Sequence, residues 1–172
     1  MAAGPTFEPI TTYTVPSNTN SVTFSSLSQS YTHLYVVCNI LSASPGNGLD
    51  YYCRINGGAS SYNSTRMGAS PTGRSTARQN QLSSFQLFYC VAGSNAGEWT
   101  SGQIWFPFYR DTTYVRNVQV QGGTTADLGR MSGFFDTTAA LNQIAFSSDI
   151  SFTGSAYIGA GSVFTIYGIA KA

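Results

Sequence analysis

The sequence predicts an all-β protein: an antiparallel β-sandwich with jelly-roll-like connections and about ten strands. Apolar and polar residues alternate with a period of two along most of the 172 residues, which is the pattern of half-buried strands. Clusters of Gly, Ser, Asn and Pro separate these stretches, as turns do. No long stretch repeats with a helical period. Many strands in one domain without helices indicate two packed antiparallel sheets.

The alternation is clearest in residues 31–40 and 49–56. Successive side chains of a strand point to opposite faces of its sheet, so every second residue shares a face. The residues that this spacing places on the core face are Leu34, Val36, Cys38, Ile40, Leu49, Tyr51, Cys53 and Ile55. Both stretches are therefore expected to be strands with one buried side.

Further strands are expected over residues 10–15, 21–24, 82–91, 103–109, 114–121, 130–136, 143–147 and 162–169. Pro107 cannot donate to a sheet ladder, so the strand that contains it is expected at a sheet edge or at a bulge. Residues 68–81 show no strand pattern and are expected to form an exposed, mobile loop that carries Arg74 and Arg78.

The composition excludes several function classes. Charged residues make up 9% of the chain and the formal net charge is +1, whereas ordinary soluble domains contain about 25% charged residues. Lys171 is the only lysine, and the arginines form no basic stripe, so neither nucleic acid nor a membrane surface is an expected partner. Because little charge repulsion opposes contact, a homo-oligomer is expected, either a dimer or a trimer.

The chain is expected to be a single domain over 1–172 with a short N-terminal arm of about ten residues. The first residues have neither the basic nor the apolar segment of a signal peptide, and no apolar stretch reaches the roughly 20 residues of a membrane helix. The arm combines poor helix and strand formers with apolar side chains, so it is expected to pack only in the assembled state. The residues expected to dock, along the sandwich or against a neighbouring subunit, are Phe7, Glu8, Pro9 and Ile10.

The pattern contains no catalytic or metal-binding constellation, so a non-enzymatic protein without a cofactor is expected. His33 is the only histidine and falls on the less apolar face of a strand. The three cysteines, Cys38, Cys53 and Cys90, lack the close spacing of zinc sites. They are expected to be buried free thiols, with one disulfide and one free thiol as the alternative.

The aromatic content is high, with eleven tyrosines and eleven phenylalanines. Tyrosine is enriched at interfaces, but aromatic residues also favour strands, and both interpretations stay open. Trp99 and Trp105 could stack on sugar rings. Because Glu98 is adjacent, a glycoside hydrolase is a distant third possibility.

Two stretches carry a resemblance. The chain reads F-E-P-I-T-T-Y-T-V from Phe7 and S-V-T-F-S-S-L-S-Q-S-Y-T-H-L-Y-V-V from Ser21, and it ends G-S-V-F-T-I-Y-G-I from Gly161 to Ile169. These strings resemble a group of tailed-phage and cyanophage virion proteins, in which a Y-T-H-L strand follows an F-S-S-I-type turn and the chain closes with G-S-x-F-x-L-Y-G-I. Leu27 and Ile166 are mild departures from that pattern. Residues 43–133 contribute nothing to the resemblance.

The resemblance implies a structural protein of the virion, made in the host cytoplasm. A capsid decoration or cement protein is the leading expectation, with the major capsid protein or other virion proteins as partners. The alternative is a tail or head-fibre receptor-binding module, lectin-like, in which Trp99 and Trp105 stack on sugar. No catalytic residue is implied by the resemblance.

Overall fold

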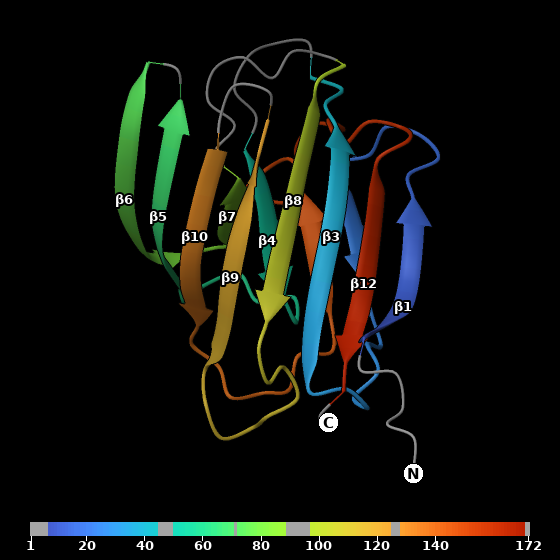
Figure 1. The fold of residues 1–172 in the computed structure, drawn as a ribbon, viewed down its shortest axis with the longest axis vertical. Helices are drawn as coiled ribbons and strands as arrows, with labels where there is room; N and C mark the ends of the chain where they lie inside the picture. Colours follow the sequence, from blue (N-terminus) through green and yellow to red (C-terminus); the bar gives the residue numbers. More distant parts are fainter. Residues whose placement is uncertain (1–6, 45–49, 71, 89–96, 125–127, 171–172) are drawn as a thin grey trace.

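Two antiparallel β-sheets, packed face to face, form the computed structural model of the protein (Figure 1). The structure describes residues 7–44, 50–70, 72–88, 97–124 and 128–170. The large sheet contains, in spatial order, β1 (Phe7–Thr14), β12 (Val163–Ile169), β3 (His33–Leu41), β8 (Trp99–Phe106), β9 (Arg116–Gly123), β10 (Leu128–Phe135), β5 (Tyr62–Ser70) and β6 (Gly73–Leu82). The small sheet contains β2 (Ser21–Phe24), β11 (Ile144–Ser147), β4 (Tyr51–Ile55) and β7 (Phe85–Phe88).

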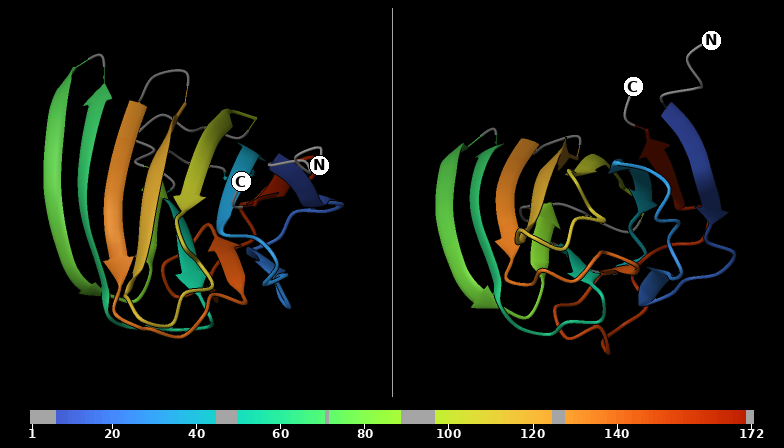
Figure 2. Two further views of the ribbon diagram at one scale, coloured as in Figure 1. Left: turned by 60° about the horizontal axis from the view of Figure 1, so that its bottom comes forward. Right: turned by 90° about the horizontal axis from the view of Figure 1, so that it is seen from below.

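The predicted fold class, a jelly-roll-like antiparallel sandwich, is confirmed. Most connections cross from one sheet to the other, and the described residues form twelve strands rather than about ten. They contain no helix, and hence none that could span a membrane. The small sheet covers only one face of the large sheet, so the opposite face is left on the outside of the molecule (Figure 2).

The core lies between the sheets and is built from the residues that the alternation places there. Of the eight residues predicted on the core faces of the first two stretches, the seven that the structure describes are buried, and Leu49 lies outside the described residues. Phe146 of the small sheet stacks on Phe164 of the large sheet with ring centroids 5.0 Å apart, and Phe24 meets Phe146 edge-on at 6.2 Å. The stack of Phe146 on Phe164 joins the two sheets directly, as expected for the apolar inner faces of a sandwich.

Cys38 and Cys53 are buried free thiols, as predicted. Burial raises the pKa of Cys38 to about 12 and that of Cys53 as well, because a thiolate loses its hydration in the core. Both thiols are therefore protonated at neutral pH and act as small apolar side chains. Cys90 lies outside the described residues.

Two predictions about the middle of the chain are wrong. Residues 68–70 and 73–81 do not form a loop, because they lie in the paired strands β5 and β6 at one edge of the large sheet. The edge strand β6 is exposed along most of its length, so polar residues replace the alternation of apolar residues by which a half-buried strand is recognised. The strand containing Ile104 is also not at an edge. It lies between β3 and β9 and ends at Phe106, immediately before Pro107, so the proline interrupts no ladder.

The predicted docking segment forms the start of an edge strand on its own sandwich. Phe7 stacks on Tyr167 with centroids 4.7 Å apart, the Tyr31 hydroxyl donates to Glu8 Oε2 at 2.8 Å, and Ile10 packs against the core. Pro9 pairs in the same ladder with β12. Residues 1–6 of the predicted arm lie outside the described residues. A docking role for residues 7–10 stays a prediction.

Gly133 in β10 fills a position where the sandwich leaves no room for a side chain. A Cβ there would lie 2.6 Å from the Asn63 carbonyl oxygen and 2.9 Å from Phe85 Cε1. We expect Gly133→Ala to lower the free energy of unfolding by about 1–3 kcal/mol, because β5 or β7 must shift to admit the methyl group.

Gly129→Ala is the matched control for this prediction, since Gly129 lies in the same strand and pairs with the same two strands, β5 and β9. Its added Cβ would make only an ordinary contact, 3.6 Å from the Met67 carbonyl oxygen. Urea unfolding followed by circular dichroism compares the two variants. Equal midpoints for both would contradict the close approach at Gly133.

Candidate functional site

The outer face of the large sheet carries rows of side chains that the pairing register aligns across its strands. Val118 and Val120 of β9 face the core, so the alternating residues Gln119 and Gln121 face outward. Successive Cα partners from β3 to β6 define the Trp105 row: Tyr35, Trp105, Gln119, Ser132, Thr65 and Arg78. The adjacent Arg130 row contains Val37, Gln103, Gln121, Arg130, Met67 and Thr76.

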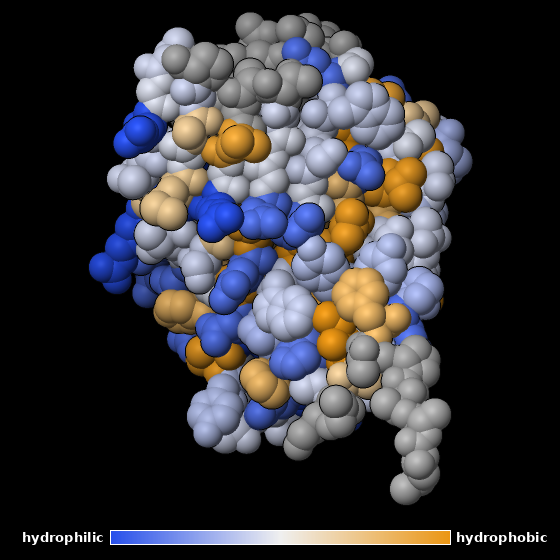
Figure 3. All heavy atoms as spheres, in the orientation of Figure 1, coloured by the Kyte–Doolittle hydropathy of each residue, from blue (hydrophilic) through white to orange (hydrophobic). Residues whose placement is uncertain are grey.

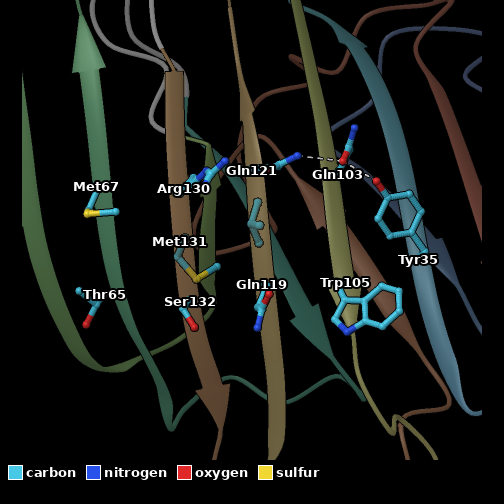
Figure 4. Close-up of a pocket in the computed structure, with 11 residues that line it drawn as sticks. Tyr35, Thr65, Met67, Gln103, Trp105, Gln119, Gln121, Arg130, Met131 and Ser132 are labelled. Carbon is cyan, nitrogen blue, oxygen red and sulfur yellow. Dashed lines mark hydrogen bonds between the residues drawn. The ribbon is translucent and has the colours of Figure 1, made fainter.

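A groove of about 600 Å³ lies over these two rows (Figure 4). The side chains that matter most for its chemistry are Tyr35, Gln103, Trp105, Gln119, Gln121 and Arg130, which come from four adjacent strands. In the space-filling view this face is mainly polar, with scattered apolar spots (Figure 3). The groove therefore combines aromatic rings, neutral amides and one guanidinium on a rigid sheet.

Two further hollows continue the groove along the same face. One of about 530 Å³ shares Gln103, Gln121 and Arg130 with it. Another, of about 330 Å³, shares Thr65 and Ser132 with it and reaches the edge strand β6. The three hollows thus form one elongated depression that crosses the strands from β3 to β6.

Trp105 is held in place by aromatic neighbours at one end of the groove. His33 stacks on the indole with centroids 5.0 Å apart, and Tyr35 meets it edge-on at 6.1 Å. The backbone N–H of Phe108 donates to His33 Nδ1 at 3.1 Å. Burial lowers the pKa of His33, which keeps the imidazole neutral at neutral pH and suited to accept this bond. The histidine therefore supports the indole and does not add charge to the groove.

The amides in the middle of the groove are fixed by hydrogen bonds. The Tyr35 hydroxyl and Gln121 Nε2 both donate to Gln103 Oε1, the second at 3.0 Å (Figure 4). Because Gln103 accepts both bonds through its oxygen, the two bonds fix the position of its amide between Tyr35 and Gln121. Side chains fixed in this way lose little entropy when they bind a ligand.

The charges on this face have one sign. Among the described strands of the large sheet, the outward positions carry Arg74, Arg78 and Arg130 and no carboxylate. The described acidic residues on the other parts of the molecule lie near strand ends and in connections; they are Glu8, Asp50, Glu98, Asp111, Asp136 and Asp149. All three arginines lie on β10 or β6, on the side of the sheet away from Trp105 and Tyr35.

The structure separates the two tryptophans that the sequence singled out. Both point outward from β8, but only Trp105 lines the groove, while Trp99 is 46% exposed at the start of the strand. Six residues of strand place them about 20 Å apart. Tyr35, Gln103 and Arg130 line the groove but were not predicted as site residues from the sequence. The only signal for them was the polar half of each strand's alternation, which is typical of any solvent-facing surface.

The described lining of the groove contains neither a pair of carboxylates nor a cluster of metal ligands. It includes no carboxylate, whereas glycosidases use a pair that flanks the scissile bond. No group of three or more His, Cys, Asp or Glu residues in the described part of the chain could hold a metal ion.

No protein-family model and no curated protein matches the chain. Several solved structures share its sandwich fold at a distance. The chain is 10% identical to the CBM40 module of a Ruminococcus gnavus sialidase solved with α2,6-sialyllactose, with 95% of each chain covered and a TM-score of 0.40. It is 9% identical to a Caenorhabditis elegans galectin, covering 93% of this chain and 96% of that one, with a TM-score of 0.35. An alginate lyase from Aplysia kurodai is 10% identical over 92% of this chain and 80% of its own, with a TM-score of 0.36. These likenesses concern the fold alone.

Proposed function

We propose that the protein is a lectin-like module that binds carbohydrate on the outer face of its large sheet. The observation that carries this proposal is the place of Trp105, a half-buried indole at one end of a groove otherwise lined largely by polar side chains. An indole offers a large apolar surface with a polar edge, which suits the C–H faces of a sugar ring. Neutral amides beside it can donate to and accept from sugar hydroxyls.

The sheet gives these groups the rigidity that binding requires. Tyr35, Trp105 and Gln121 lie on three adjacent strands, all inside the sheet and none at its edge. Side chains held on strands keep their geometry better than side chains on loops, so little ordering cost falls on the bound state. The absence of carboxylates from the described groove lining favours binding over hydrolysis. The expectation that the protein is not an enzyme remains part of this proposal.

The place of the protein in a phage particle also remains a proposal, and it rests on the resemblance of the chain ends. Of the two virion roles, the groove favours the tail or head-fibre receptor-binding module. A capsid decoration protein, docking on the major capsid protein as a dimer or trimer, would need a docking surface. The exposed large apolar side chains are instead spread over several elements; they include Phe7, Tyr13, Phe108, Tyr114 and Leu128. We therefore place decoration second.

A glycan-binding screen tests the proposed function. Purified protein is applied to a panel of immobilised neutral and acidic saccharides, and each bound saccharide is then offered free in solution as a competitor. We expect retention on a subset of the panel that the free saccharide reverses. A protein that no saccharide retains at any concentration tested would contradict the proposal.

A further inference from the structure

We infer that the ligand is an acidic saccharide, whose carboxylate or sulfate group binds Arg130 while a neighbouring sugar ring stacks on Trp105. The inference rests on the proposed function and adds the class of sugar to it. Arg130 lies on β10, two strands away from Trp105. Along β10 it lies two residues from Ser132, which is the β10 residue in the Trp105 row. Strand spacing and rise place their Cα atoms about 12 Å apart. A separation of this size suits an anionic group on a sugar next to the one that stacks on the indole.

The charge on this side of the depression supports an anion. Arg130, Arg78 and Arg74 are exposed on the outer face of β10 and β6, and no described strand of the large sheet turns a carboxylate outward beside them. A planar guanidinium can donate two parallel N–H bonds to a carboxylate or sulfate. A neutral glycan would offer these arginines no negatively charged partner.

The shape of the depression supports a ligand of more than one sugar. The groove at Trp105 joins the hollow that contains Arg78 through the shared residues Thr65 and Ser132. The Trp105 row crosses four strand spacings from β8 to β6, which is about 19 Å. An oligosaccharide lying across the strands would meet the indole first, then the amides of β9, and then the arginines.

Nucleic acid fits this surface less well than an acidic saccharide does. The chain has eight basic residues in total and a formal net charge of +1. Three separated arginines would neutralise few phosphates, whereas nucleic-acid affinity grows with the number of phosphates neutralised. One anchoring arginine beside amides and an indole suits a ligand with sparse charge and many hydroxyls.

The experiment compares acidic saccharides with related neutral saccharides. The probes are tetragalacturonate against its methyl ester, and sialylated lactose and sulfated lactose against lactose, each titrated by calorimetry into the full chain. We expect at least one acidic member to bind at least about tenfold more tightly than its neutral partner. Arg130→Gln should remove that difference. Arg110→Gln removes one charge from the β8–β9 connection, outside the groove, and should preserve the difference.

The possible outcomes distinguish the claim that the ligand is acidic from the claim that the protein binds carbohydrate. Equal affinity for the acidic and neutral members of every bound pair would overturn this inference and leave the proposed glycan binding in place. Discrimination that survives Arg130→Gln would overturn the assignment of Arg130. Failure of the wild-type protein to bind any of the five probes would overturn the acidic-saccharide inference, while the broader screen described above decides whether the protein binds carbohydrate at all.

Discussion

Trp105→Ala is expected to weaken glycan binding by about 30-fold or more, while Trp99→Ala leaves it unchanged. Central aromatic anchors commonly contribute about 2 kcal/mol or more to binding, which corresponds to that factor. The two tryptophans share a strand and a face, but only Trp105 lines the groove. Trp99→Ala is therefore a matched control for the loss of an exposed indole.

Titration calorimetry with the most strongly retained saccharide of the screen measures both variants. Since Trp105 also packs on His33, thermal unfolding of each variant must show that the fold is kept. Trp105→Phe retains an aromatic ring and is expected to fall between the wild type and the alanine variant. Equal losses from Trp99→Ala and Trp105→Ala would contradict the assignment of the site.

Phe146→Ala is expected to lower the free energy of unfolding by about 3–5 kcal/mol, the usual cost of truncating a buried phenylalanine. Phe146 is 1% exposed and stacks on Phe164 across the two sheets, so its removal leaves a cavity at the centre of the sandwich. Phe134 lies on the outer face and is 40% exposed. We expect Phe134→Ala to cost less than about 1 kcal/mol.

Urea denaturation of the two phenylalanine variants tests this account of the core. The groove lies on the opposite face of the large sheet from Phe146, so a folded Phe146→Ala variant should still bind saccharide at low temperature. If Phe134→Ala destabilised the protein as much as Phe146→Ala does, the assignment of inner and outer faces would be wrong.

The sequence predicts the inner face of the sandwich well, because burial imposes a strict period of two. Val36, Cys53 and Val118 follow that period and are all fully buried. The β5–β6 hairpin could not be predicted in the same way. Its edge strand β6 buries too little surface for apolar residues to be required. Residues 73–81 were therefore predicted as part of a loop, although the strand pairs along most of its length.

The groove could not be predicted because it depends on the register between strands. Trp105, Gln119 and Ser132 lie side by side in space but come from three strands, and a shift of one residue in any pairing would turn that strand's groove residue inward. The sequence shows which residues alternate and not which residues lie opposite each other. For the same reason it could not distinguish Trp105 from Trp99.

The fluorescence of single-tryptophan variants tests the central claim most directly. The chain has two tryptophans, so Trp99→Phe leaves Trp105 as the only indole and Trp105→Phe leaves only Trp99. We predict that a saturating concentration of the bound saccharide protects Trp105 from acrylamide quenching and leaves the quenching of Trp99 unchanged. Unchanged quenching of Trp105, under conditions where calorimetry shows the saccharide bound to the Trp99→Phe variant, would place the ligand elsewhere and contradict the proposed site.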